Sequence, residues 1–206
     1  MYKHKEGIIL RKLERKDLPL LKELKNESWF GTHTINFLND LDQERWFEGL
    51  NNRTHLILVA YKEVKISTRT TAGTLESMKE IPVGLYKIQN IDWYNRTYDS
   101  SHDVFKEHRG KGLSKPVLVA GTDFAFEVLN MNRIEGQVLE NNIASRKSAV
   151  YAGFQEEGVR RKSIHKCGQW LDSIHIGILR EDWEKLERVK GYGGICNESY
   201  TPKNDK

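Results

Sequence analysis

The segment from Arg109 to Ser114 (RGKGLS) has the residue types and spacing of an anion-binding loop. Its two glycines allow the backbone to curl so that successive N–H groups point into one concavity. The helix expected directly after the loop adds unpaired N–H donors and a partial positive charge at its N-terminus. Arginine and lysine side chains in and beside the loop add counter-charge. This combination suits a diphosphate group.

The loop differs from two familiar phosphate-binding motifs. It lacks the Gly-Lys-Ser/Thr ending of a triphosphate P-loop, and it lacks the third glycine and the early βαβ unit of a dinucleotide site. Taken alone, it is equally compatible with a glycine-rich turn that begins a helix and binds no ligand. The strands, helices and other motifs predicted around the loop are needed to choose between these two interpretations.

Apolar periodicity and turn residues predict a mixed α/β domain with a largely antiparallel sheet and at least one parallel crossover. Strands are expected at 7–13, 54–61, 81–91, 96–106 and 133–139, followed by a closing hairpin of 157–165 and 169–179. Helices are expected at 18–27 after an Asp17 N-cap, at 43–50 after Asp42, at 113–129, at 143–151 and from Asp182. The polar stretch 62–80 is expected to be a long loop, mobile without an acceptor.

Length and composition favour one globular domain, over residues 1–189, followed by a polar, Gly-rich tail at 190–206. No apolar run approaches the ~20 residues of a membrane span. Cys167 and Cys196 form neither a disulfide framework nor a metal-ligand spacing. We therefore expect a cytoplasmic protein, a monomer or homodimer, without a membrane partner or a metal.

The net charge of +4 is mild, and most basic residues are interleaved with acidic ones. A nucleic-acid partner usually requires basic residues gathered on one face. The basic segment VRRKSIHK at 159–166 gives such a partner only weak support.

Spaced motifs along nearly the whole fold resemble the GNAT superfamily of N-acetyltransferases. The pattern R-x-x-G-x-S at 109–114 resembles the family's pyrophosphate loop, with Ser in place of the usual final Gly or Ala. The N-x-x-S at 142–145 and the G-F at 153–154 resemble its next signature. Segments 43–47 and 157–183 resemble the ribosomal-protein N-terminal acetyltransferase branch, and the former also resembles amino-sugar acetyltransferases. The resemblance implies a single GNAT-like domain with a central, mostly antiparallel, splayed sheet flanked by helices.

The resemblance also implies acetyl-CoA as acetyl donor. In this family the pantetheine arm of the cofactor lies between two separated strands, which here would be 101–106 and 133–139. The loop would hold the pyrophosphate, Asn142 would lie close to the pantetheine, and Arg146 or Lys147 would reach the adenosine end. The residues that the resemblance places at the cofactor are Val104, Lys106, Arg109, Gly110, Lys111, Gly112, Leu113, Ser114, Asn142 and Arg146.

Transfer of an acetyl group to an amine requires a proton for the leaving thiolate. Many relatives supply it from a Tyr seven residues after the conserved Asn, but Ala149 occupies that position here. Tyr151 lies two residues further on, at a different angle around the helix. The predicted acid is Ser145, because the N-terminal acetyltransferase branch carries a Ser there. The alternative for Ser145 is a local hydrogen bond in the first turn of its helix.

The amine itself must lose a proton. Asp99 is the first candidate base, near the position where relatives carry a Glu, and Glu135 is the second. His102 and Asp103 compete on the same strand as Asp99, and a water chain would also suffice.

In such folds the acceptor pocket lies between the first two helices and the closing hairpin. The candidates to line it are Trp29, Phe30, His33, Trp46 and Trp93. The acceptor is expected to be a primary amine of a small molecule, such as an amino sugar, or a protein N-terminus. Two alternatives stay open: an amino group on modified nucleic acid or aminoacyl-tRNA, and a non-catalytic acetyl-CoA-binding scaffold.

Overall fold

The computed structural model describes residues 1–27, 38–51, 53–70 and 73–187. Eight strands form one sheet in the order β1-β2-β3-β4-β5-β6-β8-β7, in which only the β5–β6 pair is parallel. The strands are β1 (Tyr2–Lys3), β2 (Ile8–Lys12), β3 (Leu56–Thr70), β4 (Gly73–Asp92), β5 (Thr97–Val104), β6 (Arg133–Leu139), β7 (Gln155–Lys166) and β8 (Gln169–Leu179). The predicted mixed α/β fold, with a mostly antiparallel sheet and a parallel crossover, is confirmed.

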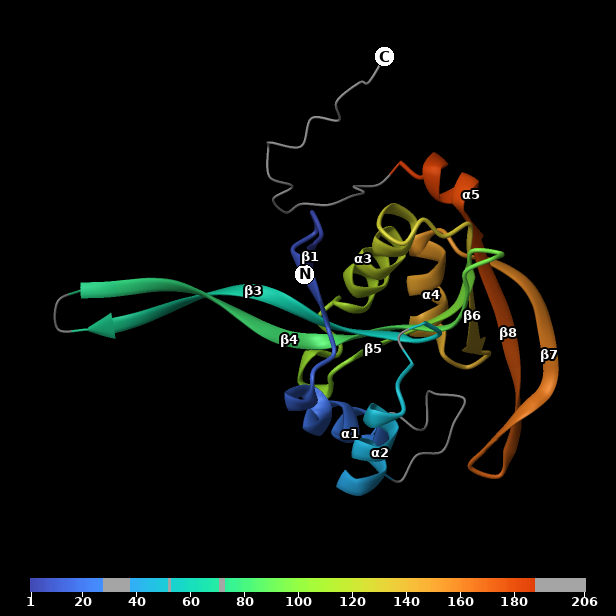
Figure 1. Ribbon diagram of the computed structural model, residues 1–206, viewed down its shortest axis with the longest axis horizontal. Helices are drawn as coiled ribbons and strands as arrows, with labels where there is room; N and C mark the ends of the chain where they lie inside the picture. Colours follow the sequence, from blue (N-terminus) through green and yellow to red (C-terminus); the bar gives the residue numbers. More distant parts are fainter. Residues whose placement is uncertain (28–37, 52, 71–72, 188–206) are drawn as a thin grey trace, which may run out of the picture.

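Helices cover both faces of this sheet (Figure 1). On one face lie α1 (Leu18–Glu27) and α2 (Asp40–Glu48), and on the other lie α3 (Ser114–Glu127) and α4 (Ile143–Ala152). The short α5 (Arg180–Lys185) directly follows β8. Because α3 connects the parallel strands β5 and β6, it is the helix of the predicted crossover.

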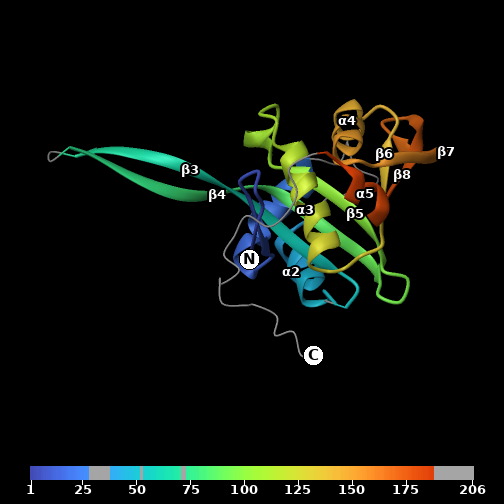
Figure 2. The ribbon, with the colours of Figure 1, turned by 90° about the horizontal axis from the view of Figure 1, so that it is seen from above.

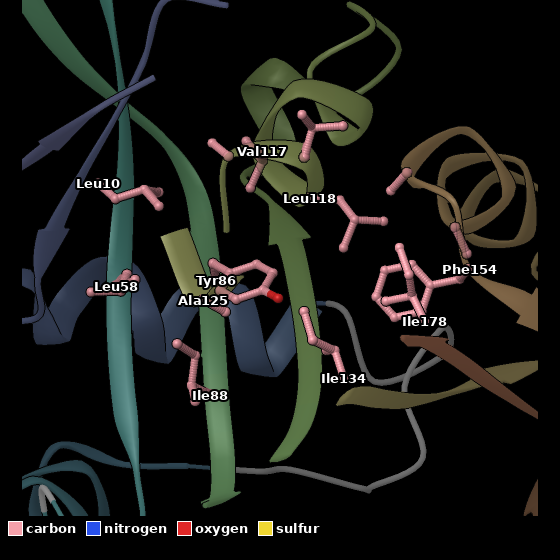
Figure 3. Close-up of a cluster of buried hydrophobic side chains, with 14 of the residues drawn as sticks. Leu10, Leu58, Tyr86, Ile88, Val117, Leu118, Ala125, Ile134, Phe154 and Ile178 are labelled. Atoms are coloured by element: carbon pink, nitrogen blue, oxygen red, sulfur yellow. The ribbon is translucent and has the colours of Figure 1, made fainter. Parts of the chain in front are cut away.

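Alternate residues of the central strands pack into two separate cores, as the period of a strand requires. Tyr86 of β4 and Ile134 of β6 belong to the core beneath α3 and α4 (Figure 3). Leu85 of β4 belongs instead to the core beneath α1, together with Leu21. A Cβ added to Gly121 would lie 2.2 Å from the Tyr86 ring, so α3 lies directly on the sheet. A side chain of β4 or β5 therefore points toward α1 and α2 or toward α3 and α4, depending on the face of the sheet that it occupies.

The sheet opens between β5 and β6. These strands pair only at Thr97–Asp99 with Arg133–Glu135. Beyond that point β5 continues beside β4 as far as Val104, while β6 continues beside β8 as far as Leu139. The central strands thus have the splayed arrangement that the family resemblance implies.

The polar stretch 62–80 is not a loop, so this prediction was wrong. β3 and β4 pair continuously from Lys62 opposite Ile81 to Thr70 opposite Gly73. They form a two-stranded arm that extends away from the rest of the molecule (Figures 1 and 2). Residues 67–69 and 74–79 are all exposed. Apolar alternation marks a strand only where one of its faces is buried, and the outer arm packs against no second layer of described residues.

The first helix spans the predicted residues 18–27 without the predicted cap, and the second begins earlier than predicted. Asp17 does not cap α1 but ends a preceding 3₁₀ turn, Arg15–Asp17, where its Oδ2 accepts a hydrogen bond from the Glu14 N–H at 2.9 Å. The N-cap of α2 is Asn39, whose Oδ1 accepts from the Asp42 N–H at 2.9 Å. Asp42 is the third residue of α2, and its Oδ2 accepts from the Asn39 N–H at 3.2 Å. Asn39 and Asp42 thus form a reciprocal capping box, and the N-cap of α2 lies three residues before the predicted one.

Candidate active site

A cavity of about 1210 Å³ opens where β5 and β6 separate. Its walls include residues 100–104 of β5 and 136–139 of β6, together with the loop before α3 and the first turns of α3 and α4. On the opposite face of the sheet its walls come from α1 and α2, through residues such as Lys25 and Trp46. The cavity therefore passes through the sheet and connects the α3–α4 side to the α1–α2 side.

The loop at the α3 end has the backbone conformation of an anion cradle. Gly110 and Gly112 have φ angles of 72° and 75°, in the left-handed region that favours glycine. A Cβ added at either position would have no neighbouring atom within 4 Å, so conformation rather than crowding requires glycine there. No side chain caps α3, and the Val117 N–H donates to the Leu113 carbonyl at 3.1 Å. The N–H groups before Val117 are the open donors of this helix end, and they fit a diphosphate.

Basic side chains surround this end of the cavity. Arg109, Lys115 and Lys147 all line it. Arg109 also donates from Nε to the Val104 carbonyl at 3.1 Å, and the Lys115 Nζ lies 4.6 Å from the centroid of the Tyr151 ring. The charge that a diphosphate requires is thus present beside the loop.

The edge of β5 that faces the cavity has no partner strand beyond Asp99. The Phe105 N–H donates to the Val83 carbonyl at 3.0 Å, so odd-numbered residues at this end of β5 direct their backbone groups toward β4. Because successive residues of a strand alternate, the backbone groups of His102 and Val104 point toward the gap. An extended, amide-rich ligand can form strand-like hydrogen bonds along such an edge.

A chain of hydrogen bonds ties this edge to the two helices. The Ser148 Oγ donates to the Ala144 carbonyl at 3.0 Å. Ser114 therefore donates to the Ser148 Oγ at 2.9 Å, and the His102 Nε2–H donates to the Ser114 Oγ at 2.8 Å. The pKa of His102 is lowered to about 4, mainly by burial; the charge of Asp103 opposes this shift, and the charge of Lys87 contributes to it. His102 is accordingly a neutral donor at pH 7, and it helps to hold Ser114 at the start of α3.

The first turn of α4 brings a hydroxyl to the cavity. Asn142 is the N-cap of α4, and its Oδ1 accepts from the Ser145 N–H at 3.1 Å. Both residues line the cavity, as does Ala149 one turn later. Tyr151 is 45% exposed and contacts Lys115 outside this cavity. Tyr151 thus lies outside the cavity and Ser145 lies on its wall, while the role of Ser145 as the acid stays a prediction.

Charged side chains dominate the cavity on the α1–α2 side. The Lys25 Nζ lies 3.9 Å from the centroid of the Trp46 ring. The Lys87 Nζ pairs with Asp103 Oδ2 at 2.7 Å, and both of these side chains are only 17% exposed. The pKa of Lys25 is lowered to about 8, mainly by burial and also by the charge of Lys87, while the charge of Asp103 opposes both effects. Of the predicted acceptor residues that the structure describes, Trp46 lines the cavity.

Neither predicted base lines the cavity. Asp99 lies where β5 still pairs with β6, and its Oδ2 accepts from the Asn90 Nδ2 at 2.8 Å. Glu135 is 48% exposed, and its Oε1 pairs with the Arg133 Nε at 2.7 Å. Asp103, a competing candidate, is the carboxylate of β5 that does line it.

Other predicted residues also lie away from the cavity. Lys106 follows the end of β5 and pairs with Glu27 at 2.8 Å, and Lys111 is exposed in the loop. Trp93 is 50% exposed and donates from Nε1 to the Arg53 carbonyl at 2.6 Å. Trp29, Phe30 and His33 lie outside the described residues.

The region predicted for the adenosine end has its own smaller cavity, of about 490 Å³. Arg146 lines it together with Lys115, Lys147 and Tyr151, and its Nη2 pairs with Glu156 Oε1 at 2.7 Å. Arg146 does not line the larger cavity, and its role at the adenosine end stays a prediction.

Sequence reasoning missed Lys25 and Lys87. Both carry a recognisable signal, because each is a charged residue at a position that should be apolar. Lys25 follows Leu21 by four residues on the buried side of α1, and Lys87 interrupts the apolar run of β4. Their meeting in one cavity depends on contacts between distant segments.

Within the described ranges, no three or more His, Cys, Asp or Glu side chains are grouped in a way that could hold a metal ion. In the same part of the chain, no helix is both long and apolar enough to cross a membrane.

Comparison with known proteins identifies the family. The family model described as the acetyltransferase (GNAT) domain matches residues 8–155, and the chain belongs to this family. Members of the family use acetyl-CoA as acetyl donor.

Individual relatives include two proteins of Bacillus subtilis. The chain is 36% identical over 80 residues to the probable N-acetyltransferase YjcK, covering 39% of this chain and 44% of that protein. It is 30% identical over 101 residues to the candidate ribosomal N-acetyltransferase YdaF, covering 49% and 55%. The chain thus spans about half the length of these curated relatives.

Among solved structures, the fold is similar to that of a spermidine N-acetyltransferase from Vibrio cholerae in complex with CoA and spermine. The TM-score is 0.75 at 20% identity, and the match covers 87% of this chain and 99% of that one. The splayed sheet and the loop before α3 therefore belong to a fold that N-acetyltransferases share.

Proposed function

We propose that this chain is an acetyl-CoA-dependent N-acetyltransferase that acts on a primary amine of a small molecule or of a protein N-terminus. The observation that carries the proposal is the continuous cavity between β5 and β6. It begins at a diphosphate cradle and ends at a charged pocket on the opposite face. A cofactor and an acceptor could thus approach one another from the two sides of the sheet.

The residues present fit the cofactor. The left-handed Gly110 and Gly112 and the open N–H groups of α3 would hold the pyrophosphate. The edge of β5 at Val104, together with Asn142 on the cavity wall, would hold the pantetheine. Burying an amide without a hydrogen-bond partner costs ~1–3 kcal/mol, so the amides of the pantetheine require the backbone partners that this edge offers. Acetyl-CoA supplies the acetyl group as an activated thioester.

The proposed proton donor to the leaving sulfur is the Ser145 hydroxyl. Ser145 lies on the cavity wall, and its backbone N–H is held by the Asn142 cap. For removal of the amine proton we favour water in the cavity, because Asp99 and Glu135 lie outside its walls. The neutral His102 keeps Ser114 and the start of α3 in place.

The test combines cofactor binding with an acceptor screen. Acetyl-CoA should raise the melting temperature of the purified protein, because it binds only the folded state. Amino sugars, polyamines and peptides with free N-termini should then be incubated with acetyl-CoA. Mass spectrometry detects the acetylated products, and a colorimetric thiol assay detects the released CoA. No melting shift at millimolar acetyl-CoA would contradict the cofactor site. A shift without any acetylated amine or thiol release would contradict the catalytic function.

A further inference from the structure

We infer that the acceptor carries an anionic group, a carboxylate or a phosphate, beside its reactive amine, and that Lys25 and Lys87 bind this group. The inference rests on the proposed function and adds the chemical class of the acceptor. It concerns the lysine pocket, which we define as Lys25, Trp46, Lys87 and Asp103 on the α1–α2 side of the cavity.

Both ammonium groups belong to this side of the sheet. Lys87 is two residues from Leu85, which packs in the α1 core, so the two side chains share a face. Asp103 stands opposite Leu85 in the antiparallel register, which explains how its carboxylate reaches Lys87. Lys25 comes from α1 itself and is close enough for the charge of Lys87 to affect its pKa.

The carboxylates around the pocket already have partners. Asp103 pairs with Lys87 at 2.7 Å, and Glu27 pairs with Lys106 at 2.8 Å. Asp42 accepts the Asn39 N–H within the first turn of α2. No described carboxylate lies within ion-pair distance of Lys25, whose ammonium group lies over the face of Trp46.

A half-buried cation beside a second cation is costly unless an anion neutralises it. An anionic group on the acceptor would accept hydrogen bonds from the Lys25 ammonium and gain from the neighbouring charge of Lys87. A polyamine would instead bring more positive charge toward the same two lysines. The pocket therefore favours an acceptor that is an amine and an acid at once.

The experiment compares matched acceptors that differ only in the anionic group. Glycine is paired with glycinamide and glucosamine 6-phosphate with glucosamine, so the two pairs distinguish carboxylate from phosphate, and spermidine is the polycationic comparison. We expect the anionic member of at least one pair to have the lower KM. Lys25→Met, which keeps an apolar stem over Trp46, should raise that KM about 10- to 100-fold and leave the KM of the neutral member unchanged.

Lys22→Met is the matched control, because it makes the same change on the same helix at a residue outside the cavity walls. It should leave both KM values unchanged. Preference of the wild-type protein for spermidine or for the neutral members would overturn the inference while leaving the acetyltransferase function intact. An equal loss of kcat by Lys25→Met with every acceptor would also overturn it, since that pattern indicates a role in proton transfer.

If no amine is acetylated, the proposed function fails, and binding still tests the pocket. Glucosamine 6-phosphate or glycine should then raise the melting temperature of the wild-type protein but not that of Lys25→Met. Equal shifts in the two proteins, or no shift in either, would overturn the inference.

Discussion

Replacement of Gly112 by valine should separate the cofactor loop from the stability of the fold. Gly112 has a φ of 75°, and no atom lies within 4 Å of an added Cβ. The cost of the substitution is therefore conformational, about 1–2 kcal/mol for an L-residue in the left-handed region. In a domain of this size each kcal/mol lowers the melting temperature by about 2–4 °C, so the expected decrease is about 2–8 °C.

Relief of this strain would rotate the loop N–H groups away from their common concavity. For the wild-type protein, ligand at 100 times its Kd adds about 2.7 kcal/mol of stability, or a shift of about 5–11 °C. The valine variant should fold, and its shift with acetyl-CoA should be lost. Differential scanning fluorimetry with and without acetyl-CoA measures both quantities.

Gly168→Val is the matched control. Gly168 has a φ of 78° and also has no atom within 4 Å of an added Cβ, but it lies in the β7–β8 turn. Its variant should lose the same stability as Gly112→Val and keep the full acetyl-CoA shift. Normal binding by Gly112→Val, or equal loss of binding in both variants, would refute the assignment of the loop as phosphate cradle.

Four further predictions concern separate parts of the molecule. Ser145→Ala should lower kcat by ~10²–10⁴-fold with little change in cofactor affinity, whereas Tyr151→Phe should be nearly silent in steady-state assays. Because the folded pKa of His102 is about 4, below its ordinary value of 6.5, its contribution to stability is complete above pH 6.5 and is lost as pH falls toward 4. Melting temperatures of His102→Gln should accordingly decline less steeply over that range. Asp123→Ala removes the fully buried acceptor of a histidine and a tryptophan, and urea unfolding should show a loss of about 3–5 kcal/mol. Replacement of 63–79 by a short turn should change the melting temperature by only a few degrees, because the arm extends away from both cores, and a large decrease would show that the arm supports the domain.

The secondary structure near the site could be predicted because its signals are local. The strand predicted at 133–139 is β6, and the helix predicted at 143–151 is α4 with one further residue. The Asn142 cap and the two left-handed glycines depend only on their immediate neighbours. The arm at 62–80 could not be recognised, because its strands are held by cross-strand pairing without the burial that creates an apolar pattern.

The candidate base illustrates where sequence reasoning stops. Asp99 and Asp103 are four residues apart in β5 and therefore lie on the same face of the strand. From the sequence, both carboxylates are candidates for the acceptor side. The separation of β5 and β6 begins after Asp99, which leaves Asp103 on the cavity wall and Asp99 beside a paired strand. The position of that separation depends on the pairing of β6 with β8, some forty residues further along the chain, and no local pattern reveals it.

The open edge of β5 also explains why binding and stability should be linked in this fold. A buried strand edge without partners is unfavourable, and here the Arg109 side chain covers the Val104 carbonyl at 3.1 Å. Arg109 is also one of the cations beside the diphosphate cradle. A ligand that pairs with the strand edge would take over the Val104 carbonyl and leave the guanidinium available to the diphosphate. Arg109 thus links the strand edge to the loop before α3, so we expect both to respond together when the cofactor binds.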